Sequence, residues 1–294
     1  MDKIFGQQIG YINYLLKGIK IKIFKKSFKK EFFYKTITNN NYIIYKWDLS
    51  GHEVFMTDCF TDWGNEYLFL DSLKNRENNI FIDVGCHTGY YPCLLQNYFK
   101  KIIGFEPNTK SINVLKNLNI KNFIYFQNFV GDKNIEVESF ETKTGWSFYN
   151  TEHNSKNISV KKIKQITLDE FCKNNDIKNI TAIKIDVDGI DLEVLYGAEE
   201  IIKYNRPSIM IENYTSELFD FFEKFNYNFF TFVSTKEKPF NLKLEKIKSF
   251  EENKWVKMIC CFPSEYSSKY SNINFEGNKF YGINRKKILD IFNL

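Results

Sequence analysis

From Asn78 onward, short apolar runs alternate with segments of helical pattern, and this alternation limits the fold more than any other feature. Strands joined through helices run parallel in one sheet, with helices covering both of its faces. The sequence therefore predicts an α/β fold with a doubly wound sheet. Strands are predicted at residues 80–84, 101–105, 123–126, 182–185 and 208–211. Helices are predicted at residues 90–98, 109–117, 168–174 and 191–204.

The N-terminal part of the chain is basic. Residues 1–46 contain ten lysines and two acidic residues, a net charge of +8, whereas the remaining residues carry −3. A helix is predicted over residues 10–30, with short strands at 43–48 and 54–60. Its apolar positions, which recur at helical spacing, are Ile12, Leu15, Ile19 and Ile23. A basic arm of this kind suits anionic partners, so the sequence leaves peripheral contact with a membrane open.

Pattern and charge divide the chain into three predicted parts. Residues 1–75 form an α/β extension that we expect to pack on the core and shape the substrate site. Residues 76–263 form a ligand-binding domain, and residues 264–294 form a tail. Within the domain, residues 143–165 lack clear periodicity, which is typical of a functional loop.

Composition argues against several classes of protein. Only Arg76, Arg206 and Arg285 are arginines among the 41 basic residues, so nucleic-acid recognition is not expected. No apolar run reaches the roughly 18 residues of a membrane-crossing helix. The first residues lack the layout of a signal peptide, which predicts a cytoplasmic protein. The six cysteines form no C-x-x-C pair, so we expect buried thiols and no zinc site.

The strongest motif runs from Phe81 to Tyr91, FIDVGCHTGYY. An apolar strand ends near Asp83, and Gly85 and Gly89 then open a helix. Glycines at this point let the backbone approach a ligand, and the first helical turn presents free N–H groups. The spacing D-x-G-x-x-x-G differs from the G-x-G-x-x-G of dinucleotide enzymes, which weakens an NAD interpretation.

Glu106 adds a second acid, at the end of the next strand. An acid in this place accepts hydrogen bonds from both hydroxyls of a ribose. Asp83 with Gly85 then faces an amino-acid moiety whose ammonium group needs an acceptor. Together they describe a site for S-adenosylmethionine (SAM). Other residues expected to contact this cofactor are His87, Tyr90, Asn128 and Phe129, the last two near the adenine.

Six ordered segments over residues 78–213 resemble the FkbM family of SAM-dependent O-methyltransferases. The segments are FIDVGCHTGYY, GFEPN, NFVGD, ITLDEF, IKIDVDGIDLEVLYGAE and RPSIMIEN. The chain departs from the family pattern at Asp188, where glutamate is usual, and at His87. The resemblance implies a Rossmann-like class I methyltransferase sheet. It also implies methyl transfer to a hydroxyl of a sugar or sugar nucleotide, often in the assembly of surface polysaccharides such as capsule or lipopolysaccharide.

Methyl transfer to a sugar hydroxyl requires that its proton be removed, by a base, a metal or both. His153, in the loop 143–165, is the leading candidate for a base, and Lys184 is the second. Asp186, Glu212 and Asn213 follow two predicted strands, and resemble the magnesium site of catechol-type O-methyltransferases. Three oxygen ligands suit Mg²⁺ or Mn²⁺. Asp186 as a helix cap and Glu212 as a partner of Lys184 are the structural alternatives.

Two other functions are compatible with the sequence. One is O-methylation of an acceptor that is not a sugar. The other is a non-catalytic scaffold that keeps the SAM fold and docks on membranes through residues 10–30. The intact Asp83, Gly85, Gly89 and Glu106 argue against the scaffold. The sequence does not decide the oligomeric state and leaves a homo-oligomer open.

Overall fold

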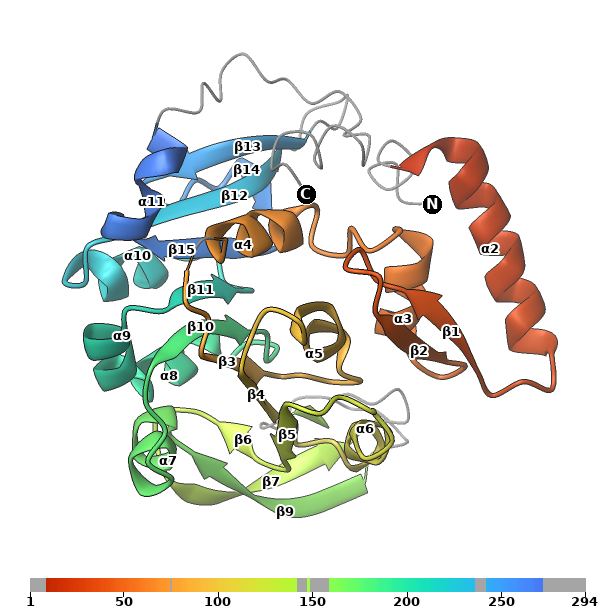
Figure 1. The fold of residues 1–294 in the computed structure, drawn as a ribbon, viewed down its shortest axis with the longest axis horizontal. Helices are drawn as coiled ribbons and strands as arrows, with labels where there is room; N and C mark the ends of the chain where they lie inside the picture. The colour runs from red at the N-terminus through yellow and green to blue at the C-terminus, as the bar shows by residue number, and fades with distance from the viewer. Residues whose placement is uncertain (1–8, 75, 142–146, 149–158, 236–241, 272–294) are drawn as a thin grey trace. The chain divides into compact units, whose positions relative to one another are not determined.

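The computed structural model describes residues 9–74, 76–141, 147–148, 159–235 and 242–271 (Figure 1). By compactness the chain divides into two units, each assembled from separate segments of sequence. The first unit comprises Met1–Glu31, His52–Arg76 and Ser208–Leu294, and the second comprises Phe32–Gly51 and Glu77–Pro207. The three-part division expected from the sequence, with boundaries after residues 75 and 263, stays a prediction.

The second unit is built on parallel strands in the order β10, β3, β4, β5. Nearly all residues of β10, β3 and β4 are buried. Strands that are apolar on both faces are typical of parallel sheets covered by helices. The predicted α/β fold with a Rossmann-like parallel sheet is thereby confirmed. The strands are β3 (Ile80–Val84), β4 (Lys101–Phe105), β5 (Phe123–Phe126) and β10 (Ile180–Ile185).

Two helices of this unit, α6 and α7, begin at a residue whose side chain caps the helix. The Asn108 side chain accepts hydrogen bonds from the backbone N–H groups of Lys110 and Ser111 at the start of α6. Thr167 accepts from the N–H of Glu170 at the start of α7. Each bond satisfies a donor that has no partner within its helix. The helices are α5 (Tyr90–Leu95), α6 (Thr109–Leu115), α7 (Leu168–Asn174), α8 (Asp191–Tyr196) and α9 (Glu199–Asn205).

The single helix predicted over residues 191–204 is wrong, because the chain forms α8 and α9 with a break at Gly197. The Gly197 carbonyl accepts from the N–H of Asp169, outside the helix. The Asp169 carboxylate then accepts from the N–H groups of Glu200 and Ile201 and so caps α9. A Cβ on Gly197 would lie 2.0 Å from the Gly131 carbonyl oxygen, so this break depends on close backbone contact.

Two smaller sheets contain the strands that do not belong to the parallel sheet of this unit. One has the order β6, β9, β7, β8, in which β7 and β9 are antiparallel and β6 and β9 are parallel. The other is the pair β1 (Glu31–Lys35) and β2 (Asn41–Tyr45). The remaining strands are β6 (Phe129–Val130), β7 (Ile135–Glu141), β8 (Ser147–Phe148) and β9 (Ser159–Ile166).

The first unit contains antiparallel strands, in which β15 pairs with both β11 and β12, and β12 also pairs with β13 and β14. Helix α4 contacts β11 and β15, and α11 contacts β12 and β15. The strands are β11 (Ser208–Ile211), β12 (Tyr227–Thr235), β13 (Leu242–Ile247), β14 (Lys254–Val256) and β15 (Ile259–Pro263). The helices are α2 (Tyr11–Lys26), α4 (Asn65–Ser72), α10 (Ser216–Glu223) and α11 (Ser264–Ser271).

The strand predicted over residues 54–60 is also wrong, because helix α3 (Leu49–Met56) occupies its first part. Asp48 Oδ1 accepts from the backbone N–H of Gly51, which is the contact of a helix cap. This cap outweighs the β-forming character of the apolar residues that follow. Among the described residues, no helix combines the length and apolar character needed to cross a bilayer.

We predict that Gly197→Ala destabilises the protein by roughly 2 kcal/mol, because its Cβ would clash with a backbone oxygen that has little freedom to move. Urea unfolding followed by circular dichroism measures the change. Gly18→Ala is the matched control, since the nearest atom to its Cβ, Met56 Cε, lies at an ordinary 3.7 Å. There alanine is expected to stabilise α2 by about 0.5–1 kcal/mol. Equal effects of the two substitutions would contradict the prediction.

Candidate functional site

The loop between β3 and α5, residues 85–89, is called the glycine loop here, and it is held tightly against the ends of the neighbouring strands. Gly85 has a φ of +79°, and a Cβ there would lie 2.0 Å from the Asp186 carbonyl oxygen. The N–H groups of Gly85 and Cys86 donate to the Phe105 carbonyl at the end of β4. Gly89, with φ +83°, precedes α5. Both predicted glycines thus occupy positions where an L-residue would be strained.

Asp83 is a buried carboxylate whose oxygens accept no hydrogen bond from the described residues. Its charged neighbour is Lys184 on the adjacent strand β10, with Nζ 3.8 Å from Asp83 Oδ1 and 2.9 Å from Asp186 Oδ2. Burial raises the pKa of Asp83 to about 7, against the opposing effect of the Lys184 charge. Such a carboxylate has unused acceptor capacity, which a ligand ammonium group would satisfy.

Glu106, directly after β4, is the second buried carboxylate of the site. Its Oε2 accepts from the N–H of His87 at 2.9 Å, and its Oε1 accepts from the N–H of Asn108 at 2.7 Å. Burial raises the pKa of Glu106 to about 8, although both hydrogen bonds act to lower it. Each carboxylate oxygen has a further lone pair, so Glu106 can bind the glycine loop and two ligand hydroxyls together.

A buried cluster around Asp48 ties β2 and the start of α3 to the glycine loop, and the sequence analysis did not identify it. Thr88 Oγ1 donates to Asp48 Oδ2 at 2.9 Å, and the Tyr42 hydroxyl lies 2.6 Å from Thr88 Oγ1 and 3.3 Å from the same Asp48 oxygen. Asp48 is fully buried, so these contacts and the Gly51 N–H supply its partners. The cap pattern Asp48-x-x-Gly51 was the available sequence signal.

The His87 side chain, which belongs to the same loop, lies next to this cluster. Its Nδ1 is 3.7 Å from Asp48 Oδ1, and its ring meets the Trp47 ring edge-on at 6.1 Å. Burial lowers the pKa of His87, whereas the Asp48 charge raises it. Nε2 is buried and makes no hydrogen bond to the described residues. The Lys110 ammonium lies 4.0 Å from the centre of the Trp47 ring. An aromatic and basic surface therefore adjoins the loop.

The other predicted cofactor contacts have structural partners. The Tyr90 ring contacts Tyr42 and Tyr91 within the core. The Asn128 amide donates to the Lys164 carbonyl, and Phe129 packs in a small buried cluster with neighbouring strands. All three cofactor assignments stay predictions.

The predicted catalytic residues are placed unequally. His153 lies outside the described residues. Lys184 is buried, with its ammonium group between the carboxylates of Asp83 and Asp186. Asp186 directly follows β10, and its side chain is about one-third exposed, 35%. Both remain candidates, with Lys184 better suited to balance charge than to take a proton.

The assignment of Asp186, Glu212 and Asn213 as metal ligands stays a prediction. Asp186 belongs to the second unit and is paired with Lys184. Glu212 and Asn213 belong to the first unit, where Asn213 Oδ1 accepts from the Thr215 hydroxyl. In the part of the chain that the structure describes, no group of three or more His, Cys, Asp or Glu residues is arranged to hold a metal ion. The described residues therefore lend no support to the expected Mg²⁺ or Mn²⁺.

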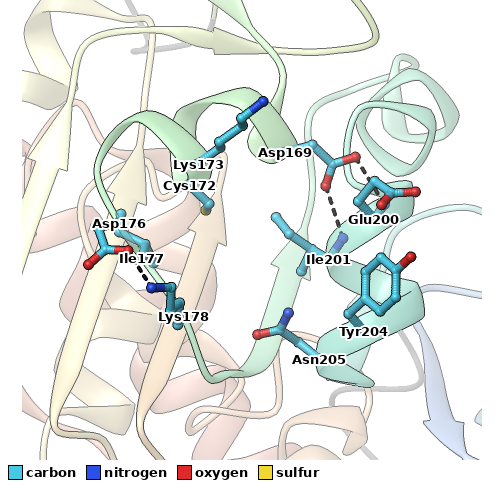
Figure 2. Close-up of a pocket in the computed structure, with 10 residues that line it drawn as sticks. All are labelled: Asp169, Cys172, Lys173, Asp176, Ile177, Lys178, Glu200, Ile201, Tyr204 and Asn205. Carbon is cyan, nitrogen blue, oxygen red and sulfur yellow. Dashed lines mark hydrogen bonds and ion pairs between the residues drawn. The ribbon is translucent and has the colours of Figure 1, made fainter.

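A cavity of about 310 Å³ lies elsewhere in the second unit, between α7, α9 and the segment before β10 (Figure 2). Figure 2 shows Asp169 reaching toward Glu200 and Ile201, where it caps α9, and Lys178 paired with Asp176. The charged groups of Asp169, Asp176 and Lys178 thus already have structural partners. The cavity adjoins the beginning of β10, whereas Asp83 and Glu106 lie at strand ends. Its lining residues are Asp169, Cys172, Lys173, Asp176, Ile177, Lys178, Glu200, Ile201, Tyr204 and Asn205.

A family model described as the methyltransferase FkbM domain matches residues 83–229, half of the chain. This range begins at Asp83 and includes the glycine loop and Glu106. The comparison with curated proteins finds no significant match. Because the similar solved structures are distant, only the family match bears on what the chain is.

Three of those structures illustrate the distance. The methyltransferase FkbM of Methylobacillus flagellatus is 15% identical, with a TM-score of 0.40, over 72% of this chain and 54% of that one. This chain thus spans about half the length of that protein. TYW2 of M. jannaschii, solved with AdoMet, is 14% identical over 81% and 88%, with a TM-score of 0.39. The precorrin-6y C5,15-methyltransferase of Geobacter metallireducens is 14% identical over 67% and 86%, with a TM-score of 0.38.

We predict that Asp83→Asn stabilises the ligand-free protein increasingly as the pH rises. Burial raises the folded-state pKa of Asp83 from its ordinary 3.8 to about 7. Between these values the folded state holds a proton that the unfolded state has lost, so wild-type stability falls as the pH rises. Asparagine does not titrate, so the variant does not lose stability in this way. Its free energy of unfolding minus that of wild type should therefore grow by up to about 1.4 kcal/mol per pH unit.

Urea unfolding at several pH values in that window measures the difference. Asp220→Asn, which changes an exposed aspartate on α10, is the control and should show little dependence. A free-energy difference between Asp83→Asn and wild type that does not vary with pH would contradict the prediction.

Proposed function

Because the chain belongs to the FkbM methyltransferase family, we propose that it transfers the methyl group of SAM to a hydroxyl oxygen of a sugar or sugar nucleotide. The observation that carries the proposal is the pair of buried carboxylates, Asp83 and Glu106, at the ends of adjacent parallel strands with a glycine loop between them. Ligands of open α/β sheets bind at the carboxyl ends of the strands, which is where these groups lie.

The two carboxylates match the two polar ends of SAM. Asp83, whose oxygens receive no hydrogen bond from the described residues, accepts the ammonium group of the methionine part. Lys184, 3.8 Å away, partly balances its charge and favours the ionised form that this contact needs. Glu106 accepts the ribose hydroxyls while its bonds to the His87 and Asn108 N–H groups keep the carboxylate in place. The adenine is assigned to the loop at Asn128 and Phe129.

The reaction forms one bond and breaks another on the methyl carbon. A lone pair of the acceptor oxygen forms the C–O bond as the C–S bond of the sulfonium breaks, which leaves S-adenosylhomocysteine (SAH). The hydroxyl proton passes to a base. Of the described candidates, Asp186 fits this role better than Lys184, because its carboxylate is partly exposed directly after β10 while the Lys184 ammonium is held between two carboxylates. His153 stays a prediction.

The nature of the acceptor rests on the family resemblance and on the surface beside the loop. Aromatic faces stack on sugar rings, and a lysine beside one suits the phosphates of a sugar nucleotide. Trp47 and Lys110 provide this pairing next to His87. The use of such an acceptor in surface-polysaccharide assembly remains part of the proposal. Metal assistance stays a prediction that the described residues do not support, and no step here requires it.

Incubation with methyl-labelled SAM and a panel of sugar nucleotides, free sugars and non-sugar alcohols tests the proposal. We predict label in a sugar or sugar-nucleotide product, with mass spectrometry locating the methyl group on oxygen. Glu106→Ala is expected to reduce the rate by at least about 100-fold, since cofactor binding and orientation both depend on this carboxylate. Full turnover in EDTA would argue against a catalytic metal, and its loss with recovery in Mn²⁺ would support one.

The same assay has two outcomes that overturn parts of the proposal. Label only in a non-sugar alcohol would replace the acceptor class and keep the methyl transfer. Saturable SAH binding without transfer to any acceptor in the panel would favour a non-catalytic role of the SAM fold.

A further inference from the structure

Helix α2, labelled in Figure 1, has large apolar side chains that are exposed to solvent, which is unusual for a helix packed on a protein body. Ile12 is 77% exposed and Ile23 is 63% exposed. Positions three or four residues apart lie on one face of a helix, so the exposed side chains form a continuous stripe along its length. The exposed apolar residues of the stripe are Ile12, Leu15, Leu16, Ile19 and Ile23.

The opposite face of α2 fixes the direction in which this stripe points. Lys17 Nζ donates to the Phe55 carbonyl at 2.8 Å and pairs with Asp58 at 3.1 Å. Phe24 is buried with its ring 6.2 Å from that of His52. These contacts all lie within the first unit. They hold the stripe outward rather than leaving the helix free to turn it inward.

The charge around the stripe is uniformly positive. Residues 9–30 contain no acidic residue, and seven lysines lie among them. At 100° per residue, Lys20 and Lys22 flank the stripe on its two sides, and Lys26 lies beside its C-terminal end. Lysine side chains in such places extend their ammonium groups away from an apolar surface toward anionic groups. The other lysines are Lys17, Lys25, Lys29 and Lys30.

We propose that α2 docks this protein on the surface of an anionic lipid bilayer, lying in the plane of the membrane. The apolar stripe enters the boundary between headgroups and acyl chains, and the flanking lysines contact anionic headgroups. A second copy of the chain is a poorer occupant, because pairing two such helices along their stripes would bring rows of lysines together. The proposal does not depend on the methyltransferase activity.

Sedimentation with vesicles tests the proposal on the full chain. Wild type is expected to pellet with vesicles of phosphatidylglycerol and phosphatidylcholine in equal parts, and to stay largely in solution with phosphatidylcholine alone. The triple variant Ile12→Ser, Ile19→Ser, Ile23→Ser should bind anionic vesicles at least about 10-fold more weakly, since it removes most of the apolar area that would enter the membrane. Raising the salt concentration should weaken wild-type binding, because it screens the lysines.

Two matched variants distinguish binding through this surface from nonspecific adsorption to vesicles. Ile124→Ser, Ile135→Ser, Val160→Ser alters three exposed aliphatic residues elsewhere and should bind vesicles like wild type. Lys20→Gln, Lys22→Gln, Lys26→Gln should lose the preference for anionic lipid. Unchanged circular dichroism and thermal unfolding would show that each variant is folded.

Wild type that stays in solution with anionic vesicles would overturn the proposal. Equal binding by wild type and the serine variant of the stripe would also overturn it. Light scattering after size-exclusion chromatography measures the oligomeric state and tests the alternative that the stripe mediates self-association. A dimer that the stripe variant abolishes, with no vesicle binding by wild type, would assign the stripe to self-association instead.

Discussion

Two carboxylates kept in a buried environment at the ends of β3 and β4 are the constraint on which the rest of this site depends. Asp83 and Glu106 are both almost fully buried, and burial alone would keep them protonated near neutral pH. Lys184 opposes this for Asp83, and two backbone N–H groups oppose it for Glu106. Near neutral pH both carboxyl groups are thus close to their pKa. A cationic ligand would neutralise the negative charge of their ionised forms.

The glycine loop connects the buried carboxylates to the N-terminal segment through hydrogen bonds. Glu106 holds the loop through the His87 N–H, and Thr88 in the same loop donates to the buried Asp48. Residues 32–51 therefore belong to the same compact unit as the parallel strands, and they place Trp47 beside the loop. The segment that completes the surroundings of the proposed cofactor site thus comes from outside the residues that the family model matches.

Much of the fold and part of the site follow from local sequence signals. Apolar runs predict β3, β4 and β5 with the same bounds that the structure has. The spacing of Asp83, Gly85 and Glu106 predicts their common edge of the sheet. Structural features that depend on contacts between distant segments of the chain were not predicted. The Asp48 cap and its bond to Thr88 join segments 40 residues apart, and they turn an expected strand into α3. Close approach of Gly131 breaks the expected helix at Gly197. Oxygen ligands of a metal have no distinctive spacing, so the assignment of Asp186, Glu212 and Asn213 stays a prediction.

The central claim is that Asp83, Glu106 and the loop between them bind SAM. Calorimetric titration of SAH into the purified protein tests this most directly, with Glu106→Ala as the site variant and the exposed Glu170→Ala as the matched control. The account predicts saturable binding to one site in wild type and the control, and loss of that binding in Glu106→Ala with folding intact. Absence of binding in wild type, or equal affinity in Glu106→Ala, would contradict it.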